Sequence, residues 1–205
     1  MRLLVKDGNA KAGAPHAPAD GSPRGAAAAE SAFKTDVAGL RAGAREHLDQ
    51  GAVTPGYRGD REAVIRMLNA ALATEIVCYL RYKRHYFMAS GMNAKSAAAE
   101  FREHAVEELA HGDRLAERIV QLGGEPDFSP HDLAARSHAE YVEGADLRAM
   151  IREDLVAERI AIDSYGAMIR HLGADDPTTR RMLEAILASE EEHAEDLQSL
   201  RGGAS

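Results

Sequence analysis

Two short segments of the chain pair glutamate with histidine at the same spacing. "EELAH" places Glu108 three residues before His111, and "EEEH" places Glu190 three residues before His193. Residues three apart on a helix share one face, so each pair can offer a carboxylate and an imidazole to one point. A single pair of this kind is usually a surface ion pair, whereas two such pairs allow a shared metal site.

Two further glutamates, Glu75 and Glu158, occupy positions where a bundle helix normally carries an aliphatic side chain. Apolar residues recur around them at spacings of three and four, which is the period of a helix face that packs against its neighbours. Burial of an unpaired carboxylate costs several kcal/mol. Four inward glutamates therefore require a common partner, and a metal cation is such a partner.

The spacing of the glutamates predicts that they converge. Glu75 and Glu108 are 33 residues apart with their midpoint in the "SGMN" segment, and Glu158 and Glu190 are 32 apart with their midpoint in "GADDP". Residues equidistant from the turn of an antiparallel hairpin lie at the same height. Each pair is then about 16 residues, or roughly 25 Å, from its turn. This height is the middle of the bundle.

Four long helical segments are expected to position these residues. The helical period is sustained from about residue 61 to residue 200, and short breaks at 90–93 and 173–177 define two antiparallel hairpins. Asp176 and Pro177 suit the N-cap and the first position of the fourth helix.

A long connection of 22 residues, 123–144, separates the second helix from the third. It can run the length of a bundle, so the sequence predicts an all-α, ferritin-like four-helix bundle with one long crossover between helices two and three. The bundle is assigned to residues 56–205 and a short helical extension to 37–55. Residues 1–36 are rich in Ala, Gly and Pro and nearly balanced in charge, which favours a disordered tail over a DNA tether.

The composition limits the classes of function. A net charge of −8, 5% aromatic residues and no Trp argue against a nucleic-acid-binding groove and suit a protein that concentrates cations. The lone cysteine, Cys78, excludes an intrachain disulfide and fits a reducing compartment. No apolar run approaches the roughly 18 residues of a membrane helix, and no secretory signal is evident. We therefore expect a cytoplasmic protein with no membrane association.

The predicted metal site combines the four inward glutamates with the two histidines. Oxygen-rich ligands with two imidazoles suit iron or manganese. One Glu from each of two helices and Glu-x-x-His from each of the other two is the ligand set of ferritin-like dinuclear proteins. The sequence thus predicts two metal ions per chain. The ligands are Glu75, Glu108, His111, Glu158, Glu190 and His193.

Three residues are expected to support these ligands. Tyr82 and Tyr165 each follow an inward glutamate by seven residues. They either bond a ligand carboxylate, supply an electron, or are simple core residues. Asp154, one turn before Glu158, either accepts the outer N–H of a ligand histidine or is an exposed acid. Cys78 is expected to be a small buried residue.

His104 and Glu107, which lie one turn before Glu108 and His111, have two interpretations. They form either an accessory iron site or a solvated pair.

The segments "ALATEIVCYLRY", "EHAVEELAH", "EDLVAERI" and "ILASEEEH" resemble the bacterioferritin branch of the ferritin-like superfamily over about residues 61–200. The resemblance implies that the six predicted ligands form a ferroxidase site, with Glu108 and Glu158 as the shared carboxylates. It also places Tyr82 on the family's central tyrosine. His104 and Glu107 fall where bacterioferritins can hold an inner-surface iron.

The chain departs from that pattern at two places. Leu109 stands where haem-binding bacterioferritins have Met, so haem is not expected. Only 12 residues follow His193, too few for the fifth helix typical of 24-subunit cages. A twelve-subunit cage or a dimer is expected instead. Dps-like mini-ferritins with bacterioferritin-type centres are similar in layout.

The ligand set and the resemblance predict a ferroxidase and iron-storage protein that oxidises Fe(II) with O2 or H2O2 and protects against iron and oxidative stress. The alternative is a dinuclear-metal peroxidase or manganese-catalase-like enzyme without storage. The cysteine pairs of a rubredoxin module are absent from the sequence, so the usual rubrerythrin electron route is missing. A metal-free structural or DNA-coating bundle is disfavoured by the net charge and by the cost of four inward carboxylates.

Overall fold

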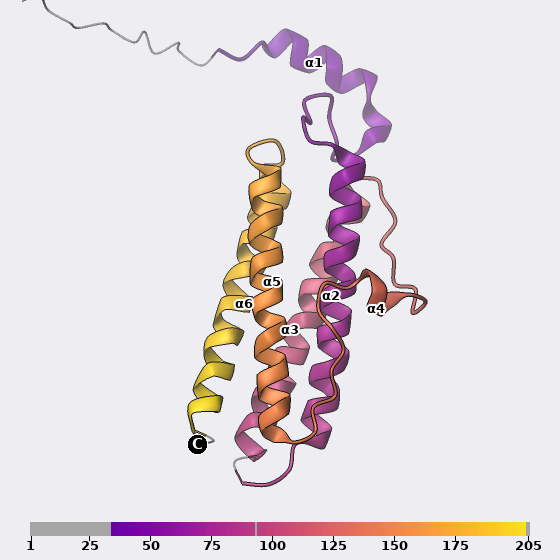
Figure 1. Cartoon of the computed structure of the whole chain (residues 1–205). Coiled ribbons are helices and arrows are strands. Elements are labelled where there is room, and N and C mark those ends of the chain that lie inside the picture. The colour runs from indigo at the N-terminus through magenta and orange to yellow at the C-terminus, as the bar shows by residue number, and fades with distance from the viewer. Residues whose placement is uncertain (1–33, 93, 204–205) are drawn as a thin grey trace, which may run out of the picture. The chain divides into compact units, whose positions relative to one another are not determined.

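The computed structural model describes residues 34–92 and 94–203, and every regular element within them is helical (Figure 1). A short helix, α1 (Val37–Glu46), and a 3-10 turn, η1 (Leu48–Gln50), precede the bundle. Residues 1–33 of the predicted tail lie outside the described residues.

Four long helices form the bundle, and consecutive helices pair as two antiparallel hairpins. The helices α2 and α3 form one hairpin, and α5 and α6 form the other. The hairpins then pack together through contacts of α2 with α5 and of α3 with α6. This arrangement confirms the predicted all-α, ferritin-like bundle. The helices are α2 (Arg61–Met88), α3 (Ala94–Gln121), α5 (Leu147–Leu172) and α6 (Pro177–Gly203).

The connection between α3 and α5 runs along the bundle, so these two helices point in the same direction (Figure 1). It contains one short helix, α4 (Leu133–Arg136), which contacts α2. The crossover thus lies against α2, and its course along the bundle is the one that its length predicts.

The predicted N-cap of α6 is confirmed. The Asp176 carboxylate accepts a hydrogen bond from the backbone N–H of Thr179 at 2.9 Å, and Pro177 is the first helical residue. The same carboxylate accepts two hydrogen bonds from Arg118 Nη2, at 2.9 and 3.1 Å. The start of α6 is thus fixed to the end of α3.

Apolar side chains fill the bundle interior mainly in two large clusters separated along the helix axes, and a third, small cluster lies around Cys78. One cluster includes Leu68, Leu115 and Leu183, and the other includes Phe101 and Leu197; all five are fully buried. Burial of such a side chain contributes about 1.5–3 kcal/mol. The polar residues of the predicted site lie between the clusters, so apolar packing closes the site above and below.

By length and composition alone, helix α2 is long and apolar enough to cross a membrane, contrary to the expectation that no segment of the chain is. Half of its most apolar window is buried inside the bundle, and the helix carries the buried Glu75 and Arg81. These features are those of a bundle core helix.

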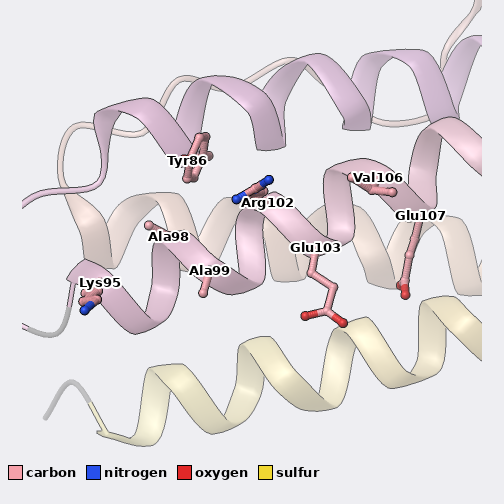
Figure 2. Close-up of a pocket in the computed structure, with 8 residues that line it drawn as sticks. All are labelled: Tyr86, Lys95, Ala98, Ala99, Arg102, Glu103, Val106 and Glu107. Carbon is pink, nitrogen blue, oxygen red and sulfur yellow. The ribbon is translucent and has the colours of Figure 1, made fainter.

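A surface hollow of about 630 Å³ lies along α3, with Tyr86 of α2 on its rim (Figure 2). Glu103 and Glu107 of α3 line it and project toward α6. Two carboxylates of α3 therefore lie at the boundary between α3 and α6.

Candidate metal centre

The four predicted glutamates meet in the middle of the bundle, one from each long helix. Glu75, Glu108, Glu158 and Glu190 are each at most 1% exposed. Their carboxylate oxygens, with nitrogens of the two predicted histidines, form two overlapping groups in which the candidate donor atoms lie within 4.8 Å of one another. The structure thus brings together all six predicted ligands.

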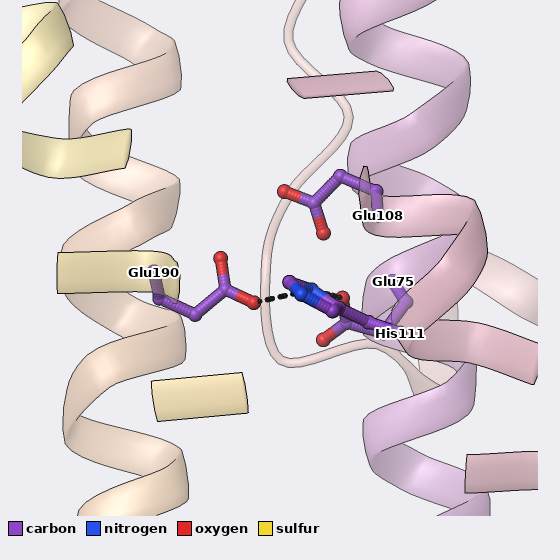
Figure 3. A group of neighbouring side chains, drawn as sticks. All are labelled: Glu75, Glu108, His111 and Glu190. Atoms are coloured by element: carbon purple, nitrogen blue, oxygen red, sulfur yellow. Dashed lines mark ion pairs between the residues drawn. The ribbon is translucent and has the colours of Figure 1, made fainter. Parts of the chain in front are cut away.

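The first group contains Glu75, Glu108, His111 and Glu190 (Figure 3). His111 Nδ1 lies 2.9 Å from Glu190 Oε1 and 3.3 Å from Glu75 Oε2. The imidazole therefore points into the carboxylates rather than toward solvent.

The second group contains Glu108, Glu158, Glu190 and His193. His193 Nδ1 lies 3.3 Å from Glu190 Oε2, 3.7 Å from Glu108 Oε1 and 3.9 Å from Glu158 Oε2. Each histidine thus faces its own set of carboxylates.

Glu108 and Glu190 belong to both groups, whereas Glu158 belongs to one; the sharing of Glu158 between two ions stays a prediction. The position of each glutamate on its helix explains this grouping. Each shared glutamate stands one turn before a ligand histidine, on α3 or α6, and reaches the space between the two groups. Glu75 and Glu158 come from α2 and α5 and each contributes to one group only.

Seven donor atoms at this centre make no hydrogen bond in the part of the chain that the structure describes, although ion-pair contacts of 2.9–3.9 Å join them. Buried polar atoms without partners are rare because each loses its hydration without compensation. Oxygen and imidazole donors at this density suit a pair of iron or manganese ions. The partnerless atoms are Glu75 Oε2, Glu108 Oε1, His111 Nδ1, Glu158 Oε2, both Glu190 carboxylate oxygens and His193 Nδ1.

Protonation balances the charges of the metal-free centre. Burial and the neighbouring carboxylates raise the pKa of Glu108 well above its usual value, and burial and Glu75 raise the pKa of Glu190 to about 7. Burial opposes a charged imidazole at His111, but the adjacent Glu190 and Glu75 outweigh it and raise its pKa to about 9. The carboxylates around His193 likewise raise its pKa. In the metal-free protein, protons therefore neutralise part of the negative charge that bound cations would otherwise neutralise.

The two predicted tyrosines each bond a ligand carboxylate. The Tyr82 hydroxyl donates to Glu158 Oε1, and the Tyr165 hydroxyl donates to Glu75 Oε1. Both rings are buried, and burial raises the pKa of both phenols, so each hydroxyl stays protonated. Of the three interpretations, the bond to a ligand carboxylate is the one that the contacts support.

The expected role of Asp154 as the partner of a ligand histidine is wrong. Its carboxylate is fully buried, 2.8 Å from Arg81 Nε and 2.8 Å from His85 Nδ1. Arg81 also donates to the carbonyl of Glu140, and His85 Nε2 lies 3.1 Å from that of Glu143. Asp154 therefore helps to fix the crossover to α2 and α5. The sequence analysis did not predict the roles of Arg81 and His85, although the two residues are four positions apart and both are buried on the inward side of α2.

Glu107 makes the contact that was expected of Asp154. Its Oε2 lies 2.5 Å from His193 Nε2, the nitrogen that faces away from the carboxylates. Such an outer carboxylate fixes the orientation and tautomer of a metal-binding histidine. The His104 ring stacks on His193 with 4.1 Å between ring centroids. Glu107 and His104 thus both contact His193, rather than each other as a solvated pair.

Residues 65–203 match the family described as Ferritin-like domain. The chain belongs to the ferritin-like family. Among curated relatives, a bacterioferritin of Desulfovibrio desulfuricans is 29% identical over 140 residues, which cover 67% of this chain and 74% of that protein. A nutrient stress-induced DNA-binding protein of Synechococcus is 34% identical over 132 residues, covering 62% and 74% respectively.

Solved structures of the family have the same fold. The dodecameric thioferritin described as the bacterioferritin-related protein of Bacteroides fragilis is 31% identical with a TM-score of 0.69, covering 71% of this chain and 88% of that one. Dps from Thermosynechococcus elongatus, at 24% identity, has a TM-score of 0.65 and covers 67% and 89%. The resemblance to the bacterioferritin and Dps-like branch of the ferritin-like superfamily is confirmed.

The lone cysteine of this ferritin-like chain packs as expected. Cys78 is buried, and burial together with the charge of Glu108 raises the pKa of its thiol well above the usual value. A neutral thiol is a small apolar side chain in the core.

Proposed function

We propose that this ferritin-like chain is a ferroxidase that binds two Fe(II) ions within one subunit and oxidises them for storage. The observation that carries the proposal is the set of buried, partnerless donor atoms in two groups that share Glu108 and Glu190. Apolar packing above and below isolates the centre, which strengthens the attraction between carboxylates and cations. The geometry supports iron over a purely structural role because uncompensated carboxylates destabilise the metal-free bundle.

Each ligand has a defined part in this proposal. Glu75 and His111 bind one Fe(II), Glu158 and His193 bind the other, and Glu108 and Glu190 contact both. The carboxylates release their protons as iron binds, and their negative charge favours the ferric product. Each Fe(II) gives up one electron. Two electrons and two protons convert O2 to H2O2, or H2O2 to two waters.

Storage requires an assembly, and we propose a homo-oligomeric cage in the cytoplasm. The thioferritin similar to this chain is described as dodecameric, which supports twelve subunits. One relative is named as DNA-binding, but the net charge of −8 disfavours the same role here. Leu109, one residue after Glu108, offers no ligand atom for haem, and the proposal includes no haem.

An anaerobic Fe(II) titration followed by addition of O2 or H2O2 tests the proposal. We expect two irons per chain and oxidation that Glu108→Ala abolishes, because that residue serves both positions. Glu103→Ala, an exposed change on the same helix, is the matched control. Binding of fewer than two irons per chain, or an unchanged rate of Fe(II) oxidation in Glu108→Ala, would contradict the proposal.

The alternative is a dinuclear-metal enzyme without iron storage, because the same ligands suit manganese. Native mass and catalytic turnover distinguish it from a storage protein. A closed cage that retains the ferric product supports storage. A small oligomer that retains no iron and decomposes H2O2 with high turnover identifies a manganese-catalase-like or peroxidase function instead.

A further inference from the structure

Side chains with soft metal-binding atoms line a surface pocket formed by α2, α5 and the crossover. The pocket has a volume of about 360 Å³. Two histidines and two methionines line it, whereas no acidic residue among the described residues does. The dinuclear centre, by contrast, is built mainly from carboxylate oxygens, which are hard donors. The lining residues are Met67 of α2, His138 of the crossover, and Ser164, Ala167, Met168 and His171 of α5.

The hydrogen bonds of two tyrosines fix the register of α2 against α5. Tyr165 of α5 bonds Glu75 of α2, and Tyr82 of α2 bonds Glu158 of α5. Seven residues forward on α2 therefore correspond to seven residues back on α5. The heights of side chains on the two helices can be compared in this register.

The crossover brings His138 to the height of the other histidine. The backbone N–H of His138 donates to Thr74 Oγ1 at 2.9 Å, and in this register Thr74 lies opposite Gly166 of α5. His171 is five residues further along α5, but a helical side chain leans back over the turn that precedes it. The two imidazoles thus lie at about the same height, beside Met168.

The donor atoms of both histidines are available to a ligand. His138 and His171 are exposed, and neither ring makes a hydrogen bond or an ion pair with another described residue. Met67 is half-buried and Met168 is 6% exposed, so the two thioethers form the shielded side of the pocket. A thioether sulfur accepts hydrogen bonds only weakly, which leaves its lone pairs for a soft metal ion.

We propose that His138, His171 and the thioethers of Met67 and Met168 bind one Cu(I) ion in this pocket. Thioether sulfur selects Cu(I), and imidazole also suits copper. Fe(II) and Mn(II) prefer oxygen donors, and no acidic residue among the described residues lines the pocket. None of the four residues belongs to the dinuclear centre, so this site does not depend on the proposed ferroxidase function.

Anaerobic titration of the full-length protein with Cu(I), in competition with the chelator bicinchoninate, tests the site. We expect one Cu(I) per chain at the pocket of the wild type and the loss of that ion in His138→Ala/His171→Ala. His131→Ala, which changes an exposed histidine of the crossover outside the pocket, should keep it. Glu108→Ala, which alters the dinuclear centre, should also keep it.

The thioethers are tested by a change that removes sulfur and conserves volume. Met67→Leu/Met168→Leu is such a change, and Met182→Leu, packed on the same core outside the pocket, is its control. We expect the double variant to lose more Cu(I) affinity than the about 10- to 100-fold that loss of an outer partner costs. X-ray absorption of copper bound to the wild type should show sulfur ligands, a measurement that needs no variant.

Four results would overturn the copper site. They are the absence of Cu(I) binding by the wild type, unchanged binding in the double histidine variant, unchanged affinity in the double methionine variant, and an absorption spectrum without sulfur ligands. Loss of Cu(I) in Glu108→Ala with retention in the double histidine variant would assign the copper to the dinuclear centre and overturn the site as well.

Discussion

Tyr165 of α5 donates its hydroxyl hydrogen to Glu75 of α2, and both side chains are buried. Tyr82 of α2 makes the matching bond to Glu158 of α5. On each helix the tyrosine follows the glutamate by seven residues, so each helix holds the other's ligand. The two hairpins are therefore related by an approximate two-fold repeat at the centre, and each unshared carboxylate is oriented from across the bundle.

The crossed arrangement predicts which metal position each tyrosine supports. Tyr165→Phe leaves Glu75 without its hydrogen bond and should weaken the His111 position by about tenfold, because loss of an outer hydrogen bond costs that order of affinity. Tyr82→Phe should weaken the His193 position instead. Anaerobic Co(II) titrations that resolve two dissociation constants measure both. Weakening of the same position by both variants would contradict the crossed pairing.

Glu107 is predicted to strengthen the His193 position alone. Its carboxylate lies 2.5 Å from His193 Nε2, and no such partner of the outer nitrogen of His111 is found among the described residues. Glu107→Ala should lower the affinity of the His193 position about 10- to 100-fold and leave the His111 position unchanged. Glu103→Ala is the control, since it lines the same hollow without touching either histidine. An equal loss in both variants would indicate a general charge effect.

The heights of the ligands could be predicted from the sequence, because equal distances from a turn fix where Glu75 meets Glu108 and where Glu158 meets Glu190. The spacing does not fix the rotation of each helix about its axis or the rotamer of each side chain. For this reason the spacing does not predict that Glu190, rather than Glu158, falls in both groups of donor atoms, or that Asp154 contacts Arg81 and His85.

The buried ion pair between Arg81 and Asp154 could not be predicted from the sequence for a similar reason. Arg81 and Asp154 come from helices whose contact depends on how the two hairpins pack, and no local pattern encodes that packing. The motif "EELAH" does not indicate that its first residue, Glu107, rather than Asp154, contacts His193.

Metal affinity is predicted to increase with pH. In the metal-free protein the pKa of Glu190 is raised to about 7 and that of His111 to about 9, and the pKa of Glu108 is also raised. Cations need the deprotonated forms, so protons compete at low pH and are released on binding. Affinity should therefore rise with pH across the range from about pH 6 to about pH 9. Calorimetry in buffers of different ionisation enthalpy measures the protons released, and affinity independent of pH across this range would contradict the prediction.

Asp154 is predicted to stabilise the fold rather than to bind metal. Asp154→Asn removes the charge that compensates the buried Arg81, and loss of one partner of a buried ion pair costs about 3–5 kcal/mol. The free energy of unfolding of the metal-free protein in urea should fall by about that amount, while two metal ions still bind. Because Arg81 also bonds the carbonyl of Glu140, amide hydrogen exchange should increase in residues 139–143. Asp163→Asn, an exposed change on the same helix, is the control. Equal stability of the two variants would show that the ion pair contributes no net stability.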